Sequence, residues 1–537
     1  MSDSPGIPAR VFEFSVDTNA NVLHNESLER WCVDRSGATS RYRMGGIFVE
    51  TNPSQGGNIS IPLVGSEQLY YRRDTEKIQV SSDPRRLGSP NDSVDANGFL
   101  SLLQFGALVP PLSLNSSIRR MIPGRRYQLE SGAKGIRNIG PSRVYKEAAK
   151  ITLDRVDFLS ELIDSILVEA CPDRNPLILF SGGVDSGVLA ARAAAMGWKD
   201  TLLLNYAMGE DDPESLHAEA VANTLGLPFR RVLRDVSFGD EFLQGVYATY
   251  KQPFCDFSCI PTSEIAIAAI DASGRRRTIL DGTGADGAFG LFGKAKGWRK
   301  VYRTPQAIRS AAHNLYDGLG MWKRNSRVEY VMRLLARASD STPAAAAIAQ
   351  SSAKGSLVHP DADVSSANSF IGDWLGEILP RQQDGVLLGA LDMSLVCSDR
   401  YAQKNKAIFD SAGEKVVYPF LHDKIVELAL TTVSSWPDAE FPKQTLKEIL
   451  SRCLPDSQVQ RPKSGFAPPI RQYLARTSFV AAYDRLLDSD NGLTKQLNMP
   501  RFKALRAYLV QSAPLPVTTV SVLWTAIIVN EWMNQSN

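Results

Sequence analysis

Cysteine is scarce in this sequence, with six residues in a chain of 537. Only Cys255 and Cys259 lie close together, and no second pair follows at the spacing of a zinc site. A disulfide framework or a cysteine metal site is therefore not expected. We interpret the thiols as buried or idle groups in a reducing compartment.

Long apolar runs and an excess of one charge are also missing. No stretch approaches the roughly 18 uninterrupted apolar residues that a membrane-spanning helix needs. The segment Met1 to Ala9 lacks the basic region and apolar core of a signal peptide. With 60 basic and 58 acidic residues, the net charge of +2 provides no long-range attraction to nucleic acid or to an anionic membrane. The expectation is a cytoplasmic protein that binds neither of them.

A chain of this length predicts two to four domains. Residues 1–145 hold short β-type runs separated by Gly, Pro, Asn and Ser clusters, which is typical of antiparallel sheets. Residues 338–368 are rich in Ala, Ser and Asp. We interpret them as a surface excursion, with an alanine-rich helix as the alternative.

From residue 146 onward, expected helices and strands alternate. The strands are expected at 177–180, 201–206, 230–233 and 278–280, and the helices at 151–169, 187–196 and 214–225. This alternation predicts an α/β domain over 146–537, with a doubly wound parallel sheet and a helical tail. Ligands are expected at the carboxyl ends of its strands.

A glycine turn directly follows the first of these buried strands. It reads Ser181-Gly182-Gly183-Val184-Asp185-Ser186 and leads into an expected helix. Small residues let backbone N–H groups converge on a phosphate, and the helix dipole and serine hydroxyls add to the attraction. Asp185 offers an oxygen ligand for the Mg²⁺ that accompanies ATP. The Gly-Lys-Ser/Thr ending of a Walker motif is absent, and a plain tight turn is the alternative interpretation.

Two further segments suggest the same chemistry. The turn Asp281 to Gly287 follows another buried strand and holds three glycines and Asp286, a second carboxylate for Mg²⁺. The segment Arg461 to Pro469 places Lys463 in a loop restricted by proline and glycine, where the lysine would neutralise charge on a phosphate or an oxyanion. A glycine-rich connection and a solvated surface lysine are the respective alternatives.

These segments together resemble the asparagine synthetase family, whose synthetase half is an N-type ATP pyrophosphatase. The matching residues, in chain order, are Met44 to Phe48, Leu69 to Tyr71, Ile122 to Gly124, Ser181 to Ser186, Asp281 to Gly287, Tyr418 to Leu421 and Arg461 to Phe466. The first three are similar to the later half of the family's glutaminase domain. The resemblance implies a degenerate glutaminase-like (Ntn-type) β-sandwich at 1–145 and an ATP-binding synthetase domain at 146–537.

The resemblance also implies a reaction, with ATP and Mg²⁺ as cofactors. A carboxylate attacks the α-phosphorus of ATP, and an amine then attacks the acyl-adenylate and releases AMP. The implied roles are pyrophosphate binding by Ser181, Gly182, Gly183 and Ser186, Mg²⁺ binding by Asp185 and Asp286, adenosine binding by backbone near Leu179, Met208 and Gly282, and charge stabilisation by Lys463.

The sequence departs from the family pattern at two places, and a third position, Asp399, has a rough counterpart in one branch of the family. The glutaminase half needs an N-terminal cysteine nucleophile, whereas Ser2 follows Met1 and no cysteine precedes Cys32, so glutaminase activity is not expected. Thr283 stands where asparagine synthetases have a glutamate and β-lactam synthetases a tyrosine, and threonine is a poor base. Asp399 lies roughly where the β-lactam branch has a supporting acid, with a helix-surface carboxylate as the alternative.

These departures favour the branch of β-lactam synthetases and lasso-peptide macrolactam cyclases. The expected substrate is a small-molecule or peptide carboxylate that carries its own amine, in natural-product biosynthesis of the antibiotic type. A precursor peptide, a protease and a second copy of the chain are the expected partners. Three alternatives remain open: an ammonia-dependent asparagine synthetase, a tRNA-modifying enzyme with the pyrophosphatase loop, and a non-catalytic partner protein.

Overall fold

The structure is a computed structural model, which describes most of the chain in segments. These are residues 13–17, 22–24, 30–33, 40–44, 46–52, 56–74, 77–89, 92–130, 135–146, 154–235, 242–254, 256–273, 277–323, 325–339, 341–351, 357–359, 361–362, 365–380, 383–411, 414–461, 469–511 and 514–536.

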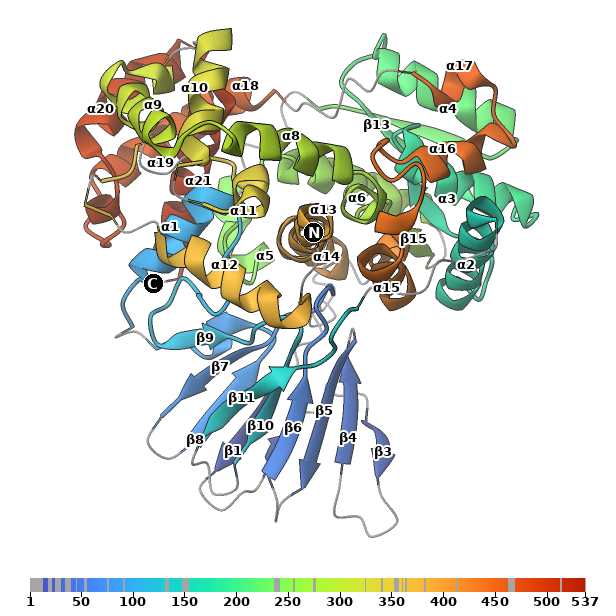
Figure 1. The fold of residues 1–537 in the computed structure, drawn as a ribbon, viewed down its shortest axis with the longest axis horizontal. Helices are drawn as coiled ribbons and strands as arrows, with labels where there is room; N and C mark the ends of the chain where they lie inside the picture. The colour runs from blue at the N-terminus through green and yellow to red at the C-terminus, as the bar shows by residue number, and fades with distance from the viewer. Residues whose placement is uncertain are drawn as a thin grey trace.

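Two antiparallel sheets form the N-terminal part, drawn in blue to cyan at the bottom of Figure 1. One has the order β2-β1-β8-β7-β9, with bounds Val22–His24, Glu13–Asp17, Lys77–Ser81, Tyr70–Arg73 and Ile118–Arg120. The other has the order β11-β10-β6-β5-β4-β3, with bounds Ile136–Pro141, Arg125–Leu129, Gly56–Ser60, Ile47–Asn52, Ser40–Met44 and Arg30–Val33.

Alternating side chains explain why these two sheets pack face to face. Ile47 and Val49 of β5 are buried, whereas Phe48 between them is exposed. Ile78 and Val80 of β8, in the other sheet, belong to the same apolar cluster as the two β5 residues. A strand places successive side chains on opposite faces, so the inner faces of both sheets share one core. The antiparallel sheets expected in this region are therefore present.

The C-terminal part is built on a parallel sheet of order β14-β13-β12-β15-β16. The bounds in that order are Phe229–Leu233, Leu202–Ala207, Leu177–Leu179, Thr278–Leu280 and Lys415–Val417. The parallel sheet predicted from the sequence is confirmed, with strand ends within about one residue of those expected. The edge strand β16 was not predicted, because three residues without a helical or alternating pattern carry no signal of their own.

Both faces of this sheet are covered by helices. Ile178 and Leu280 belong to one apolar cluster, together with residues of α3 (Val184–Ala195) and α4 (Pro213–Leu225). Their strand neighbours Leu177 and Ile279 belong to a second cluster, with residues of α6 (Cys259–Ser273). Burial on two faces makes these strands continuously apolar. The sheet is thus doubly wound, as the alternation of elements predicts.

The order of the strands creates a switch point between β12 and β15. From β12 the chain winds through β13 to β14 on one side, and β15 and β16 lie on the other side. Connections that leave in opposite directions open a crevice at the carboxyl ends of the two central strands. The two glycine turns, Ser181 to Ser186 and Asp281 to Gly287, follow these two strands.

Helices make up most of the remaining chain (Figure 1). In chain order they are α1 (Ala96–Phe105), α2 (Arg155–Ala170), α5 (Val246–Thr249), α7 (Ala285–Phe289), α8 (Phe292–Tyr302), α9 (Gln306–Gly318), α10 (Arg327–Arg337), α11 (Pro343–Ile348), α12 (Ser365–Ile378), α13 (Asp384–Leu391), a π-helix (Asp392–Ala402), α14 (Gln403–Ser411), α15 (Asp423–Thr431), α16 (Gln444–Ser451), α17 (Asp456–Val459), α18 (Ile470–Leu474), α19 (Thr477–Leu487), α20 (Met499–Val510) and α21 (Val517–Asn534). In the described part of the chain, none is both long and apolar enough to cross a membrane.

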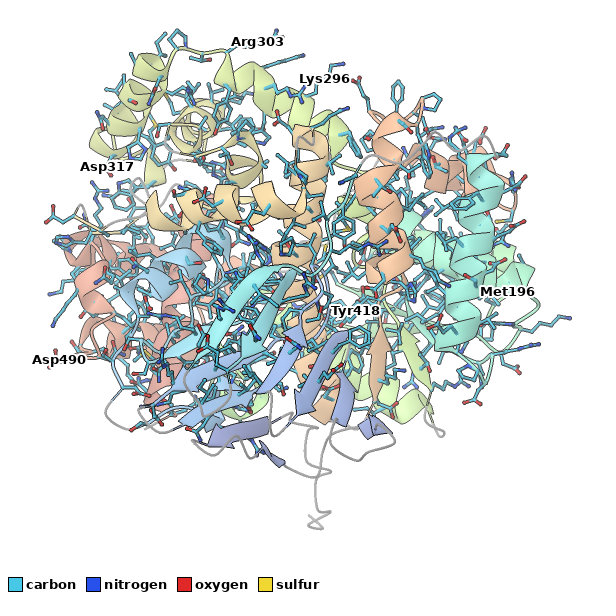
Figure 2. All side chains as sticks on the ribbon, turned by 60° about the horizontal axis from the view of Figure 1, so that its bottom comes forward. Met196, Lys296, Arg303, Asp317, Tyr418 and Asp490 are labelled. Atoms are coloured by element: carbon cyan, nitrogen blue, oxygen red, sulfur yellow. The ribbon has the colours of Figure 1, made fainter. Side chains whose placement is uncertain are left out.

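The apolar interior continues across residue 145. Leu102 of α1 belongs to the same buried cluster as Trp524 of α21, although more than 400 positions separate them. Figure 2 shows the periphery, where charged residues such as Lys296, Arg303 and Asp490 lie, and Tyr418, which is buried. The division of the chain at residue 145 stays a prediction, and its two parts share a core.

The alanine-rich segment is placed differently from our first expectation. Residues 344–349 are buried, and α11 (Pro343–Ile348) lies in the large cluster that also holds the β12 residue Ile178. Alanine side chains are small enough for helices to approach closely, so a run of them favours a packed helix over a solvated loop. The surface excursion is therefore wrong for this part of the segment, and the alternative of an alanine-rich helix is correct.

Candidate functional site

The first glycine turn is shaped by a position that only glycine fits. Gly182 has a φ of +72°, and a Cβ there would lie 2.7 Å from Ala218 Cα of α4. The Ser186 Oγ accepts a hydrogen bond from the Ser181 N–H at 3.2 Å. Helix α3 begins at Val184, inside the motif and earlier than the expected residue 187. Asp185 and Ser186 therefore lie in the first turn of α3, whose N-terminus favours an anion.

Hydrogen bonds at its own aspartate anchor the second glycine turn. The Asp281 Oδ1 accepts from the Thr283 N–H at 2.7 Å, and the Asp281 Oδ2 accepts from Asn405 Nδ2 at 2.6 Å. Gly284 has a φ of +110°, and a Cβ there would lie 2.5 Å from Leu421 Cδ2. Asp286 follows in the first turn of α7. The loop is thus fixed by the hydrogen bonds of Asp281 and by the close packing of Gly284 against Leu421. These contacts set the position of Asp286.

The two turns touch each other at Gly282. A Cβ on Gly282 would lie 3.0 Å from the Asp185 Cβ and 3.0 Å from the Ser186 N. A larger residue would push the two turns apart, so glycine is required for their close approach. The structure therefore brings together four of the residues named from the sequence: Asp185, Ser186, Gly282 and Asp286.

Lys443 completes the arrangement, and sequence reasoning missed it. Its Nζ lies 2.7 Å from an Asp185 carboxylate oxygen and 2.7 Å from Asp286 Oδ1. Burial lowers the pKa of this ammonium group, but the two carboxylates outweigh burial and raise the pKa above its ordinary value. Lys443 is therefore the charged partner of both carboxylates. No motif marks this lysine in the sequence, because its role depends on two loops far away in the chain.

The backbone at Lys443 fits this interpretation. The residue has a φ of +56°, which is uncommon for any side chain other than glycine, and it lies just before α16. Its N–H donates to the Phe289 carbonyl of α7 at 2.9 Å. Strained backbone persists only where the surroundings enforce it, and it concentrates at functional sites.

The donor set fits a magnesium ion bound together with a nucleotide. Asp185 and Asp286 converge on one cation, the Lys443 ammonium group, which shows that a positive charge is favourable between them. In the described part of the chain, no group of three or more His, Cys, Asp or Glu side chains forms a closed metal site. Mg²⁺ commonly takes one or two carboxylates and completes its shell with phosphate oxygens and water.

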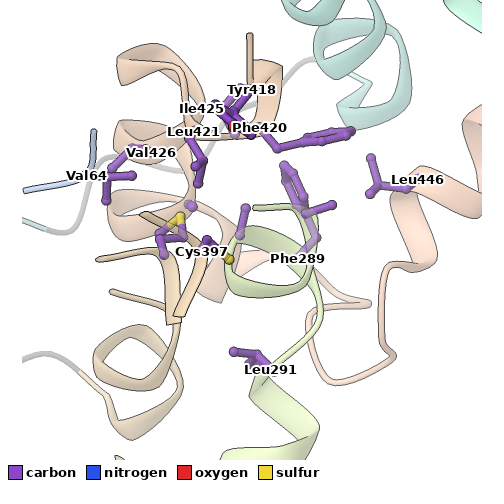
Figure 3. Packing of buried hydrophobic residues seen from close by; sticks show 14 of the residues in the cluster. Val64, Phe289, Leu291, Cys397, Tyr418, Phe420, Leu421, Ile425, Val426 and Leu446 are labelled. Carbon is purple, nitrogen blue, oxygen red and sulfur yellow. The ribbon is translucent and has the colours of Figure 1, made fainter. Parts of the chain in front are cut away.

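A cluster of buried apolar side chains packs against α7, the helix that follows the second turn (Figure 3). The Phe289 ring of α7 packs edge-on against Phe420 at 6.4 Å between centroids and stacks on Trp436 at 6.1 Å. Leu446 of α16 belongs to the same cluster. Close packing of large rings resists displacement. The carboxylate of Asp286 is thus mounted on a rigid support.

Two of the three residues expected to contact adenosine, Leu179 and Met208, lie at neighbouring strand ends. Leu179 is the last residue of β12, and Met208 directly follows β13. The Met208 N–H donates to Asp212 Oδ2 at 2.8 Å, which leaves the carbonyl of Met208 as its backbone group for a nucleotide. Their positions are compatible with the predicted roles, which stay predictions.

Asp399 does not lie on the surface of a helix, which was the alternative interpretation from the sequence. It is buried in the π-helix, and its carboxylate accepts bidentate hydrogen bonds from Arg120 of β9 and a third from Gln68 Nε2 at 2.7 Å. The interpretation as a helix-surface carboxylate is therefore wrong. Burial raises the pKa of Asp399, although Arg120 and Gln68 oppose this effect. Its predicted role as a supporting acid stays a prediction.

Lys463 lies outside the described residues, but the chain on both sides of it can be placed. Arg461 donates to the Pro213 carbonyl at 3.2 Å and pairs with Glu214 at 3.0 Å, at the N-terminus of α4. Beyond the gap, Gln472 of α18 accepts from Arg234, which follows β14, at 3.0 Å. Both flanking residues thus lie near the carboxyl ends of β13 and β14, on the ligand edge of the sheet.

Comparison with known proteins agrees with this geometry. The family model described as asparagine synthase matches residues 159–534, which include both glycine turns and Lys443. A search of curated proteins found no match. The match covers well over half of the sequence and contains the whole parallel sheet. The chain therefore belongs to the asparagine synthase family.

Proposed function

We propose that this protein forms an amide bond through an acyl-adenylate and releases AMP and pyrophosphate. The observation that carries the proposal is the convergence of Asp185, Asp286 and Lys443 at the switch point of the sheet, at distances of 2.7 Å. A cation between two carboxylates, next to a helix N-terminus, suits a polyphosphate with its metal. Membership of the asparagine synthase family supports ATP as the source of that polyphosphate.

The chain's own residues divide the work of the first step. Backbone N–H groups of Gly182 and Gly183, with the Ser181 and Ser186 hydroxyls, bind the leaving pyrophosphate. Asp185 and Asp286 would hold Mg²⁺, which would neutralise charge on the phosphate oxygens. Lys443 adds a second positive charge to the same group. The substrate carboxylate is thereby aligned with the α-phosphorus, and the P–O bond to pyrophosphate breaks as the bond to the carboxylate forms.

In the second step an amine attacks the acyl carbon and AMP leaves. We assign stabilisation of the developing oxyanion to Lys463. Thr283 holds the position at which relatives carry a glutamate or a tyrosine, and its hydroxyl is a weak base. This favours an amine that the substrate itself positions, because an intramolecular nucleophile reaches a high effective concentration.

The proposed product is a lactam or macrolactam made from a peptide, of the lasso type, or from a small amino acid. Cys32 lies inside strand β3 (Arg30–Val33), where it pairs with Arg41 of β4 in the sheet. We therefore propose a glutaminase-deficient member that acts in the cytoplasm on a precursor peptide, together with a protease, and without glutamine as a donor.

The decisive experiment incubates the protein with ATP, magnesium and candidate substrates, and measures the nucleotide and phosphate products. AMP and pyrophosphate are expected in equal amounts, and only when a carboxylate substrate with an amine is present. ADP as the nucleotide product would refute the mechanism. Formation of asparagine from aspartate and ammonia would instead assign the protein to the ammonia-dependent synthetases, and release of glutamate from glutamine would contradict the proposed loss of glutaminase activity.

A further inference from the structure

A continuous helix holds the second glycine turn at both ends. The part of it that matters here, the helix Asp392–Ser411, consists of the π-helix and α14 and directly continues α13. At the start of the turn, Asn405 Nδ2 donates to Asp281 Oδ2 at 2.6 Å. At its end, a Cβ on Gly287 would lie 2.6 Å from Met393 Cγ and 3.0 Å from an Asp392 carboxylate oxygen. Contacts this close transmit any shift of the helix to the turn that carries Asp286.

The N-terminal part of the chain makes several polar contacts with the same helix. Four contacts join the segment Gly65–Gln68 to it: the Gly65 N–H to Ser398 Oγ (3.3 Å), Gln403 Nε2 to the Ser66 carbonyl (2.6 Å), Lys406 Nζ to Glu67 Oε1 (3.1 Å) and Gln68 Nε2 to Asp399 Oδ1 (2.7 Å). These contacts are spread over residues 398–406, about two helical turns, so they fix the rotation of the helix as well as its position.

Arg120 supplies the most restrictive of the contacts. Its side chain is 2% exposed and that of Asp399 is 3% exposed. Both terminal nitrogens of Arg120 bond to the Asp399 carboxylate, the second at 2.7 Å. A bidentate guanidinium–carboxylate pair defines distance and orientation together. Asp399, the acceptor of this pair, lies in a π-helix, a form that is rare and recurs at functional sites, whereas Arg120 ends strand β9.

We propose that the N-terminal β-sandwich positions the second glycine turn through the helix Asp392–Ser411, with Arg120 as the positioning residue. The β-sandwich thereby fixes the position of the second glycine turn, which is one of the two turns of the proposed pyrophosphate site. This inference rests on the proposed function insofar as the turn binds pyrophosphate. It assigns no chemistry to Arg120, which acts through Asp399 and the helix.

The test compares full-length variants by calorimetric titration with magnesium pyrophosphate, well below their unfolding temperatures. The change Arg120→Met is expected to weaken binding by about tenfold. This is the lower end of the loss of affinity that is typical when a residue that orients the binding residues, without touching the ligand, is removed. Arg120→Lys, which keeps the charge but loses the fork, is expected to lie between Arg120→Met and the unaltered protein. Asn405→Ala releases the turn itself. Combined with Arg120→Met it is expected to weaken binding by less than the product of the two single effects, because both act on one path.

Arg125 provides the matched control. It joins the same two parts of the chain at another place, donating to the Trp374 carbonyl of α12 at 3.3 Å and pairing with Glu377. Arg125→Met is expected to lower the unfolding temperature but to leave pyrophosphate affinity within about twofold.

The outcomes separate this inference from the proposed function. Equal binding by Arg120→Met and the unaltered protein would overturn the inference alone. Failure of the unaltered protein to bind magnesium pyrophosphate would overturn the proposed function, and the inference with it. If Arg120→Met does not fold, Arg120→Lys decides, and its full affinity would refute the role of the fork.

Discussion

At the scale of single residues, Lys443 is the side chain on which the candidate site depends. It is 10% exposed and balances two carboxylates that would otherwise repel each other across a few ångströms. Its charge is also of the right sign for pyrophosphate. The proposed function therefore gives this one side chain a structural role without nucleotide and a binding role with it.

Replacing Lys443 by methionine separates these two roles. In metal-free protein the variant is expected to lose about 1–3 kcal/mol of unfolding free energy, since Asp185 and Asp286 remain unbalanced and Asp286 is partly solvated. Added Mg²⁺ is expected to raise its unfolding temperature more than that of the unaltered protein. Thermal unfolding with and without magnesium measures both effects, and an equal magnesium shift in the two proteins would contradict the assigned metal site.

The raised pKa of Asp392 predicts how the stability of the protein changes with pH. Burial raises its pKa to about 6, against a lowering by the Cys397 thiol, which donates to it at 3.3 Å. The folded state thus binds its proton more tightly than the unfolded chain does. Ionisation therefore costs stability: the cost is absent below about pH 4, grows between pH 4 and 6, and is complete above pH 6, at no more than about 3 kcal/mol.

The variant Asp392→Asn removes this cost. It is expected to match the unaltered protein near pH 4 and to be more stable at pH 7, measured by urea unfolding of metal-free protein. Asp92 is the matched control of opposite sign, because hydrogen bonds from Asn115 and the Ser89 N–H, with the Arg72 pair, overcome burial and lower its pKa. Asp92→Asn should lose stability at pH 7. A gain from both variants would show that the changes act through something other than ionisation.

At the scale of elements, the site consists of two strand-to-helix turns that meet only because glycine stands at three positions. Gly182 and Gly284 adopt a positive φ, and Gly282 allows the turns to touch. The adjoining helices α3 and α7 present their N-termini on the same edge of the sheet. The candidate site is therefore formed by a pair of elements, and neither turn forms it alone.

Gly284→Ala tests this pairing. The left-handed backbone and the Leu421 methyl group in the way are expected to cost about 1–3 kcal/mol of stability and to displace Asp286. Gly297→Ala in the exposed part of α8, where a Cβ meets nothing within 4 Å, is expected to gain up to about 1 kcal/mol. Chemical unfolding measures stability, and titration with magnesium pyrophosphate should show weakened binding for Gly284→Ala alone.

At the scale of the whole molecule, the N-terminal and C-terminal parts share an apolar core, so we expect them to unfold as one cooperative body. Helix α1 packs against α21 at the other end of the sequence, in a shared apolar cluster. Buried polar contacts, among them those of Arg120 and Arg125, join the β-sandwich to the helical part. Unfolding of one part exposes the apolar face of the other.

The variant Leu102→Ala is expected to expose this coupling. Leu102 is fully buried in α1, so its truncation should cost about 2–5 kcal/mol. Calorimetry is expected to show one transition displaced to lower temperature. Two separated transitions would indicate that the parts unfold independently, contrary to a shared core.

The sequence alone determined the parallel sheet, the glycine turns after two of its strands, and the carboxylates Asp185 and Asp286. These features are encoded locally, in apolar periodicity and in residue types that tight turns demand. Tertiary structure decided which cation faces the carboxylates, because Lys443 approaches them from more than 150 positions away from either. It also decided that Asp399 is buried against Arg120. Local patterns carry no record of such pairs, since contacts between distant segments arise only when the sheet brings its strand ends together.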